Sequence, residues 1–174
     1  MTDLSSRPVR MVFTSRAGGV SSSPYDSFNL GTHVGDVPAD VAENRARLAR
    51  ILQVPSERFV WMEQLHTNTV TVVDGPQSEP VAATDAVVTR ERGLALCVLV
   101  ADCTPVLLSD HAAGVVAAAH AGRMGARNGI VARTVEHMVE CGARPERIQV
   151  LLGPAAAGES YDCLLYTSPS PRDS

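Results

Sequence analysis

The chain has 174 residues, enough for one domain with a buried core, and its 45% hydrophobic content is ordinary for a globular protein. Its formal net charge of −4 gives no reason to expect nucleic acid or an anionic membrane as a partner. All 15 basic residues are arginines, which excludes a Walker lysine, a Schiff-base lysine or a Ser–Lys dyad within this chain.

The compartment is predicted from two further absences in the sequence. No apolar run reaches transmembrane length, and the first residues lack the apolar core of a signal peptide. The four cysteines form no CxxC pair, which is typical of free thiols in a reducing compartment. We therefore expect a soluble cytoplasmic protein.

The first part of the chain predicts a strand, a loop and a helix. Val9–Thr14 is a strand candidate, and it enters the loop Ser15–Asn29, which is dense in Gly, Ser and Pro. In that loop the Gly18-Gly19 pair frees the backbone for a tight turn or a close approach to a ligand, and Arg16 is a candidate for holding an anion. Apolar residues at helical spacing predict a helix over Val37–Leu52, with Asp40 as a candidate cap.

Short strands are predicted through the middle of the chain, at Arg58–Met62, Thr69–Val73 and Asp85–Thr89. Between the first two lies His66, preceded by Gln64, a side chain able to orient it. Two longer apolar runs follow at Ala95–Ala101 and Val115–Ala119. Continuous runs of this kind are typical of strands buried on both faces.

A hairpin is predicted between Pro105–Ser109 and the second apolar run, because Asp110–Gly114 supplies turn residues. If it folds about Ala112, Cys103 lies opposite Ala121 and about one residue from His120, at a cross-strand spacing of roughly 5 Å. A thiolate and an imidazole at that range can share a metal ion or a proton. The alternative is that Cys103 only packs as a small apolar side chain and His120 is structural.

The last third predicts a helix over Ala126–Glu140 and a strand over Arg147–Leu152. Small residues between His120 and that helix would let the helix N-terminus face the site. From Cys163 onward the composition changes abruptly, and Cys163–Ser174 resembles a translated sequencing adapter. We expect residues 1–162 to form the domain and residues 163–174 to be a foreign, disordered tail.

Several motifs in a fixed order carry a resemblance to a known family. They are FTSRAGGVSSSPYDSFNLGTHVGD, ENRARL, QLH, DAVVT, ADCTPVLLSD, AAAHAGRMG and LLGP. This series is similar to the bacterial laccase-domain family, also called multicopper polyphenol oxidoreductase, purine nucleoside phosphorylase or peptidoglycan editing factor. The resemblance covers about Val9–Tyr161 and implies a single α/β domain with mixed β-sheets between helices.

The resemblance also implies a metal site, made of His66 in QLH, Cys103 in ADC and His120 in AHAG, which would be the catalytic residues too. Two imidazoles and a thiolate suit zinc and leave a coordination position for water or substrate, while copper accepts the same ligands. The three ligating atoms should then converge within about 4 Å of one another. His111 and His137 match no ligand motif.

Further residues are expected to bind the substrate or phosphate; they are Arg16, Asn29, Gln64, Asp102 and Arg123. Arg123 and Met124 stand where the family commonly has Trp and Arg. The family's C-terminal portion is absent from this sequence.

The function implied is a zinc-dependent purine nucleoside phosphorylase acting on adenosine, inosine and methylthioadenosine. Its ligands would be a small nucleoside and phosphate, and a metal-bound water would add adenosine deamination. One alternative is a Cys–His hydrolase that edits peptidoglycan precursors, with Cys103 as nucleophile. Another is a copper-dependent phenol oxidase, although five histidines are few for several coppers. A metal-stabilised binding protein without turnover is the non-enzymatic alternative, and the oligomeric state is not fixed by the sequence.

Overall fold

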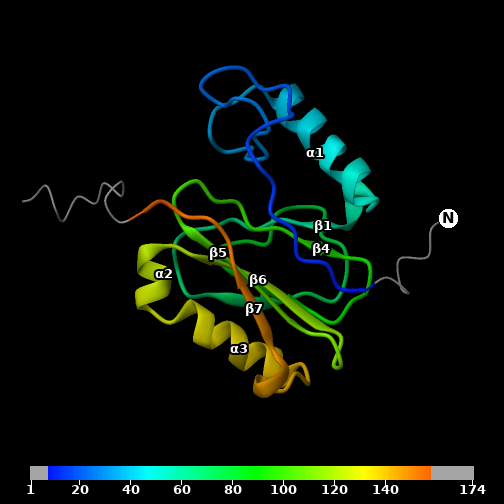
Figure 1. Cartoon of the computed structure of the whole chain (residues 1–174), viewed down its shortest axis with the longest axis vertical. Coiled ribbons are helices and arrows are strands. Elements are labelled where there is room, and N and C mark those ends of the chain that lie inside the picture. Colours follow the sequence, from blue (N-terminus) through cyan, green and yellow to red (C-terminus); the bar gives the residue numbers. More distant parts are fainter. Residues whose placement is uncertain (1–7, 158–174) are drawn as a thin grey trace, which may run out of the picture.

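This computed structural model describes residues 8–157, in which one helix is followed by six strands, two further helices and a last strand (Figure 1). The helices are α1 (Pro38–Leu52), α2 (Arg123–Arg127) and α3 (Ile130–Glu140), and single 3-10 turns lie at Ser56–Arg58 and Pro145–Arg147. The strands are β1 (Phe59–Val60), β2 (Val70–Val72), β3 (Ala86–Thr89), β4 (Ala95–Leu96), β5 (Thr104–Asp110), β6 (Val115–Ala121) and β7 (Gln149–Leu152).

The strands form two sheets. The larger one has the order β2-β3-β6-β5-β7, in which β2 and β3 run parallel and the other neighbours run antiparallel. The smaller one is the parallel pair β1-β4. Mixed strand directions and flanking helices confirm the expected mixed α/β class.

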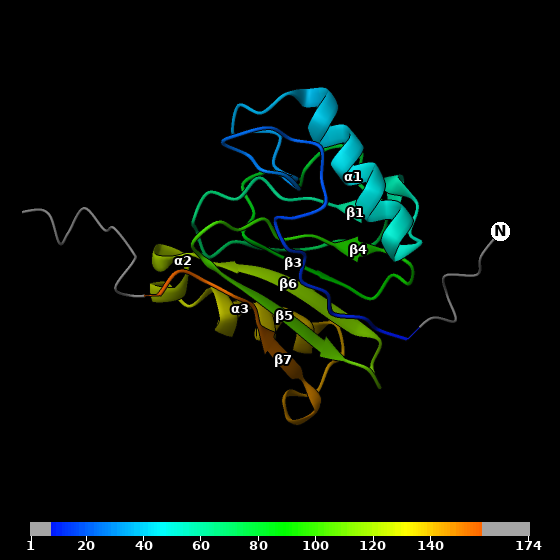
Figure 2. The ribbon, with the colours of Figure 1, turned by 45° about the horizontal axis from the view of Figure 1, so that its top comes forward.

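The layers follow from the alternation of side chains along β3. Ala86 and Val88 are buried in one cluster with Ile130 of α3, whereas Val87 belongs to a second cluster with Val60 of β1. A third cluster joins α1 to the other side of the β1-β4 pair. The order of layers is therefore α3, the five-stranded sheet, the β1-β4 pair and α1, as Figure 2 shows. Both faces of the central strands β3, β5 and β6 are covered, as the apolar runs predict, whereas the edge strand β7 is exposed.

Most predicted elements are present in a shortened form, but the strand predictions for Val9–Thr14 and for the end of Ala95–Ala101 are wrong. Residues 9–14 form no strand and instead line a groove. The run beginning at Ala95 leaves the sheet after Leu96. The physical reason is Gln64, whose side-chain amide accepts the N–H of Leu99 at 2.8 Å and donates to its carbonyl at 2.7 Å. These are the backbone groups that a neighbouring strand would need.

Two predictions at helix ends are also corrected. Asp40 does not cap α1: the N-cap is Val37, which makes no side-chain cap bond, and Asp40 lies in the first turn. The helix predicted over Ala126–Glu140 is two helices, because Gly129 adopts a left-handed φ of 81° between α2 and α3.

Within the described residues, no helix is long and apolar enough to cross a membrane. The tail predicted over 163–174 and the last residues of the predicted 1–162 domain lie outside the described residues.

Candidate metal and active site

His66, Cys103 and His120 lie together at one edge of the large sheet. One ligand atom from each can be chosen so that all three lie within 4.8 Å of one another. His120 is in β6, Cys103 immediately precedes β5, and His66 is in the loop between β1 and β2. The sequence-predicted convergence is therefore present, and its spacing is somewhat wider than the expected 4 Å.

The β5-β6 hairpin brings Cys103 and His120 to the same edge, with a register one residue from the predicted one. Thr104, not Cys103, is opposite Ala121. The difference arises because Asp110 pairs with Val115, so that four residues form the turn and its centre lies after Ala112. The Asp110 carboxylate closes this turn by accepting the N–H of Ala112 at 3.0 Å.

The space between the three donors exists because residue 122 is a glycine. A Cβ at Gly122 would lie 2.7 Å from Nδ1 of His66 and 3.3 Å from both Sγ of Cys103 and Cε1 of His120. A tetrahedral zinc ion brings such ligands to roughly 3.3–3.6 Å from one another. The group therefore fits zinc after a contraction of about 1 Å, which the exposed His66 side chain can supply.

Asp85 holds both histidines, a role that the sequence did not predict. The carboxylate is fully buried; its Oδ1 accepts the N–H of His66 at 3.0 Å and lies 2.9 Å from Nδ1 of His120. Its Oδ2 accepts the N–H groups of Leu65 and Thr67 and the Thr67 hydroxyl, at 3.2, 2.8 and 2.7 Å. The only sequence signal for it is an acidic residue directly before a buried apolar strand.

Electrostatic surroundings shift two pKa values at this site. Burial acts to raise the pKa of Asp85, but hydrogen bonds from His120, Thr67 and Leu65 outweigh it and hold that pKa below its usual range. Burial raises the pKa of the Cys103 thiol, and the carboxylate of Asp102 adds to this, while the backbone N–H of Arg123 opposes it. In the absence of a metal ion, Cys103 is therefore a protonated thiol at neutral pH.

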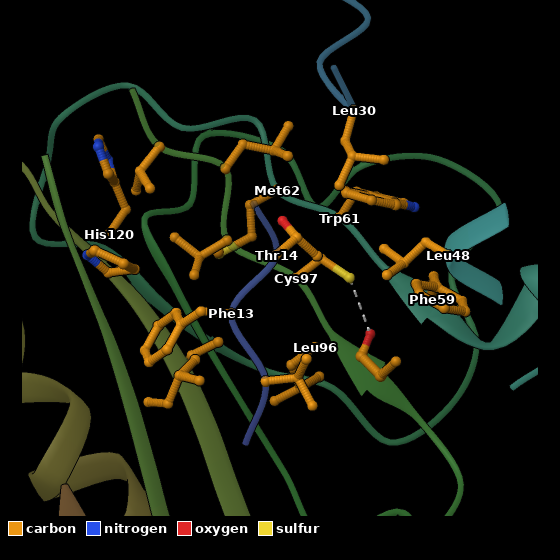
Figure 3. Close-up of a pocket in the computed structure, with 18 of the residues that line it drawn as sticks. Phe13, Thr14, Leu30, Leu48, Phe59, Trp61, Met62, Leu96, Cys97 and His120 are labelled. Atoms are coloured by element: carbon orange, nitrogen blue, oxygen red, sulfur yellow. Dashed lines mark hydrogen bonds between the residues drawn. The ribbon is translucent and has the colours of Figure 1, made fainter. Parts of the chain in front are cut away.

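The predicted substrate residues lie in one groove with the three donors, except for Arg123. Arg16, Asn29, Gln64 and Asp102 line this groove, whose volume is about 1620 Å³. Arg123 begins α2 and does not line it. Figure 3 shows His120 at one side of the view and Trp61, Leu48 and Phe59 at the other, where the groove is apolar.

Several of these polar side chains already have structural partners. Nε of Arg16 donates to the carbonyl of Asp26 at 2.8 Å, and the amide of Asn29 donates to Asp36 at 2.9 Å. Gln64 holds Leu99, as described above, and does not orient His66. The Gly18-Gly19 pair also serves the loop itself, because a Cβ at Gly19 would collide with the backbone of Ser27.

Comparison with known proteins identifies the family. Residues 10–164 match the family described as multi-copper polyphenol oxidoreductase laccase. The chain belongs to this family. The resemblance found in the sequence is thereby confirmed, and it extends over the whole described region from residue 10 onward.

Relatives named as purine nucleoside phosphorylases are similar over most of this chain. One from Corynebacterium glutamicum is 63% identical over 162 residues, which are 92% of this chain and 66% of that protein. Another from Mycobacterium tuberculosis is 52% identical over 154 residues, which are 88% of this chain and 62% of that protein. The chain thus spans a little under two thirds of the length of these curated relatives.

Solved structures of other proteins have the same fold as this chain. The crystal structure of the Bacillus licheniformis hypothetical protein YfiH superimposes with a TM-score of 0.79 at 32% identity, over 84% of this chain and 58% of that one. YlmD from Geobacillus stearothermophilus gives a TM-score of 0.77 at 38% identity, over 82% of this chain and 56% of that one.

Proposed function

We propose that this chain carries the metal centre of a zinc-dependent purine nucleoside phosphorylase that acts on adenosine, inosine and methylthioadenosine. The observation that carries the proposal is the convergence of His66, Cys103 and His120 around the space at Gly122, within a groove. The identity of 52–63% to proteins named for this activity supports the reaction class.

The residues of the chain have distinct parts in this proposal. His66, Cys103 and His120 hold the ion, which when bound supplies a Lewis acid and lowers the pKa of a bound water towards 7, as adenosine deamination would need. Arg16 brings positive charge to the groove, and its terminal nitrogens have no protein partner among residues 8–157. It is our candidate for binding phosphate, whose oxygen bonds to C1′ of the ribose as the bond to the purine breaks. Copper is the alternative ion for this donor set.

A second candidate function rests on the side chains of Asp85, His120 and Cys103, which lie next to one another in that order. An acid that orients an imidazole beside a thiol is the arrangement of a Cys–His hydrolase, the peptidoglycan-editing alternative. A multicopper phenol oxidase has less support, because His66, Cys103 and His120 are the only group of three metal donors within residues 8–157.

Metal analysis coupled to turnover tests the proposal. We expect the purified chain to hold one zinc per molecule and to release hypoxanthine from inosine only when phosphate is present, as followed by chromatography. His66→Ala should lose both properties, whereas His137→Ala is the matched control, because that histidine is on α3 beside Glu140 and away from the centre.

The chelator arm separates the two candidate functions. Phosphorolysis that stops on zinc removal and returns on zinc addition supports the phosphorylase. Phosphorolysis that persists in the zinc-free chain contradicts the zinc dependence, whereas hydrolysis of a peptidoglycan precursor by the zinc-free chain favours a nucleophilic Cys103. A zinc-loaded chain that leaves all three nucleosides intact, alongside an active Corynebacterium glutamicum relative, would also contradict the proposal.

A further inference from the structure

We propose that Asp85 is the positioning residue of the metal centre: it fixes the ring of His120 and the backbone of His66, and thereby sets the affinity for zinc. This inference rests on the proposed metal site and deepens it. Asp85 is not itself offered as a ligand, because both of its oxygens are already engaged by other groups and it is fully buried.

Asp85 determines which nitrogen of His120 faces the site. Oδ1 of Asp85 also accepts the N–H of His66, so it acts as an acceptor and the contact at 2.9 Å requires Nδ1 of His120 to donate. A neutral ring with its proton on Nδ1 has its lone pair on Nε2. The backbone is held as well, because the N–H of His120 donates to the carbonyl of Asp85 at 2.7 Å.

The ring of His66 is exposed, so burial does not hold it in place. His66 has a left-handed φ of 60°, a conformation that is unfavourable for a non-glycine residue unless its surroundings hold it. Three consecutive N–H groups, those of Leu65, His66 and Thr67, donate to the one carboxylate and hold this turn. The carboxylate therefore fixes the point from which the His66 ring reaches the other two donors.

The substitution Asp85→Asn disrupts the positioning of His120 and His66 with little change in side-chain size. The asparagine amide presents one acceptor oxygen and one NH₂ group, so the NH₂ group must face donors that the carboxylate satisfied. Loss of such a partner of a metal ligand typically weakens metal binding 10–100-fold. We expect a loss in this range for Asp85→Asn, measured by competition with a chromophoric zinc chelator.

Asp110→Asn is the matched control. Asp110 is also fully buried and also accepts backbone N–H groups, those of Ala112, Ala113 and Arg144, but it lies at the opposite end of the β5-β6 hairpin from the metal centre. We expect this variant to lose stability and to keep its zinc affinity within about twofold. Equal weakening of zinc binding in both variants would show a general loosening of the fold and would overturn the proposal.

A spectroscopic readout tests positioning without relying on turnover or on bound zinc. In the zinc-free chain, nitrogen–proton correlation spectra distinguish the two neutral forms of a histidine ring, and comparison with His120→Gln assigns the signals. We expect the wild-type ring to carry its proton on Nδ1, and Asp85→Asn to show a mixture of both forms. A wild-type ring protonated on Nε2 would overturn the proposal, as would unchanged zinc affinity in Asp85→Asn.

The zinc affinity and the state of the His120 ring test different claims, so one can fail without the other. If the wild-type chain binds no zinc, the proposed metal site is wrong and the affinity part of this inference falls with it. The state of the His120 ring would still show whether Asp85 positions that histidine, as the hydrolase alternative also requires.

Discussion

Replacing Gly122 with alanine should weaken zinc binding without lowering the stability of the fold. The backbone of Gly122 has φ −68° and ψ 164°, an extended conformation that any residue adopts, so alanine introduces no backbone strain. At such a position Gly→Ala stabilises a protein by about 0.4–1 kcal/mol, because the unfolded chain loses freedom. For a chain of this size, that corresponds to a rise in Tm of no more than about 4 °C.

The magnitude of the effect on zinc follows from the distances around the new methyl group. The added Cβ would be 2.7 Å from Nδ1 of His66, whereas real Cβ atoms essentially never approach closer than 3.0 Å and ordinary contact begins at 3.4 Å. The His66 ring must therefore retreat by about 0.3–0.7 Å from the space at Gly122, although zinc binding requires the three donors to close around that space by about 1 Å. Sγ of Cys103 and Cε1 of His120, both at 3.3 Å from the methyl group, limit any compensating shift of the ion.

We expect Gly122→Ala to weaken zinc binding at least tenfold, which is about 1.4 kcal/mol, while the Tm of the zinc-free chain stays equal or rises slightly. Chelator competition measures the affinity, and circular dichroism of the zinc-free chain measures Tm. Gly75→Ala is the matched control, because a Cβ at that position meets no atom within 4 Å. Zinc affinity in Gly122→Ala equal to that of both wild type and Gly75→Ala would refute the steric argument.

Further predictions concern the thiols and the buried carboxylate of the hairpin. Cys103→Ser should lose zinc and phosphorolysis together, and retention of either one, measured on the same preparation, would contradict a ligand role. Burial raises the pKa of Cys97 to about 12, so peptide mapping after alkylation of the folded chain at pH 8 should find Cys97 unmodified; rapid labelling there would show that the thiol is accessible. For Asp110, burial acts to raise the pKa, but the N–H of Arg144, the guanidinium of Arg147 and the N–H of Ala113 outweigh it and hold the pKa at about 2, below the ordinary 3.8. Its contribution to stability is therefore fully present above about pH 4 and is lost as the pH falls towards 2, so urea midpoints of Asp110→Asn should lack that part of the wild-type pH dependence.

The parts of the fold that the sequence predicted are those governed by local pattern. The apolar run at Val115–Ala119 and the turn residues Asp110–Gly114 were sufficient to place β5 beside β6. That hairpin alone brings Cys103 to the edge where His120 lies, so two of the three donors follow from contacts close in sequence. An error of one residue in the register left the conclusion intact, because Cys103 and His120 remain at the same end of the hairpin in either register.

The parts that the sequence could not predict depend on side chains that bind backbone far away in the chain. Gln64 removes residues 97–101 from the strand that their apolar character predicts, through hydrogen bonds to Leu99, which is 35 positions away. Asp85 is also 35 positions from His120, and the donors that it satisfies include three backbone N–H groups, which are the same for every residue type. The left-handed turn at His66 is held by three N–H groups that donate to that carboxylate, and composition carries no sign of it.

The two enzymatic interpretations share the Asp85–His120 pair and differ in the state of Cys103. As a metal ligand, the thiolate is committed to the ion, and an alkylating reagent should react slowly until a chelator removes the zinc. As a free nucleophile, it has to be a thiolate without help from a metal, yet burial and the neighbouring carboxylate of Asp102 raise its pKa and keep it protonated. The rate of Cys103 alkylation with zinc and with chelator therefore distinguishes the interpretations. A rate that is equally fast in both conditions would remove the phosphorylase proposal's metal ligand and leave the hydrolase as the better explanation of this site.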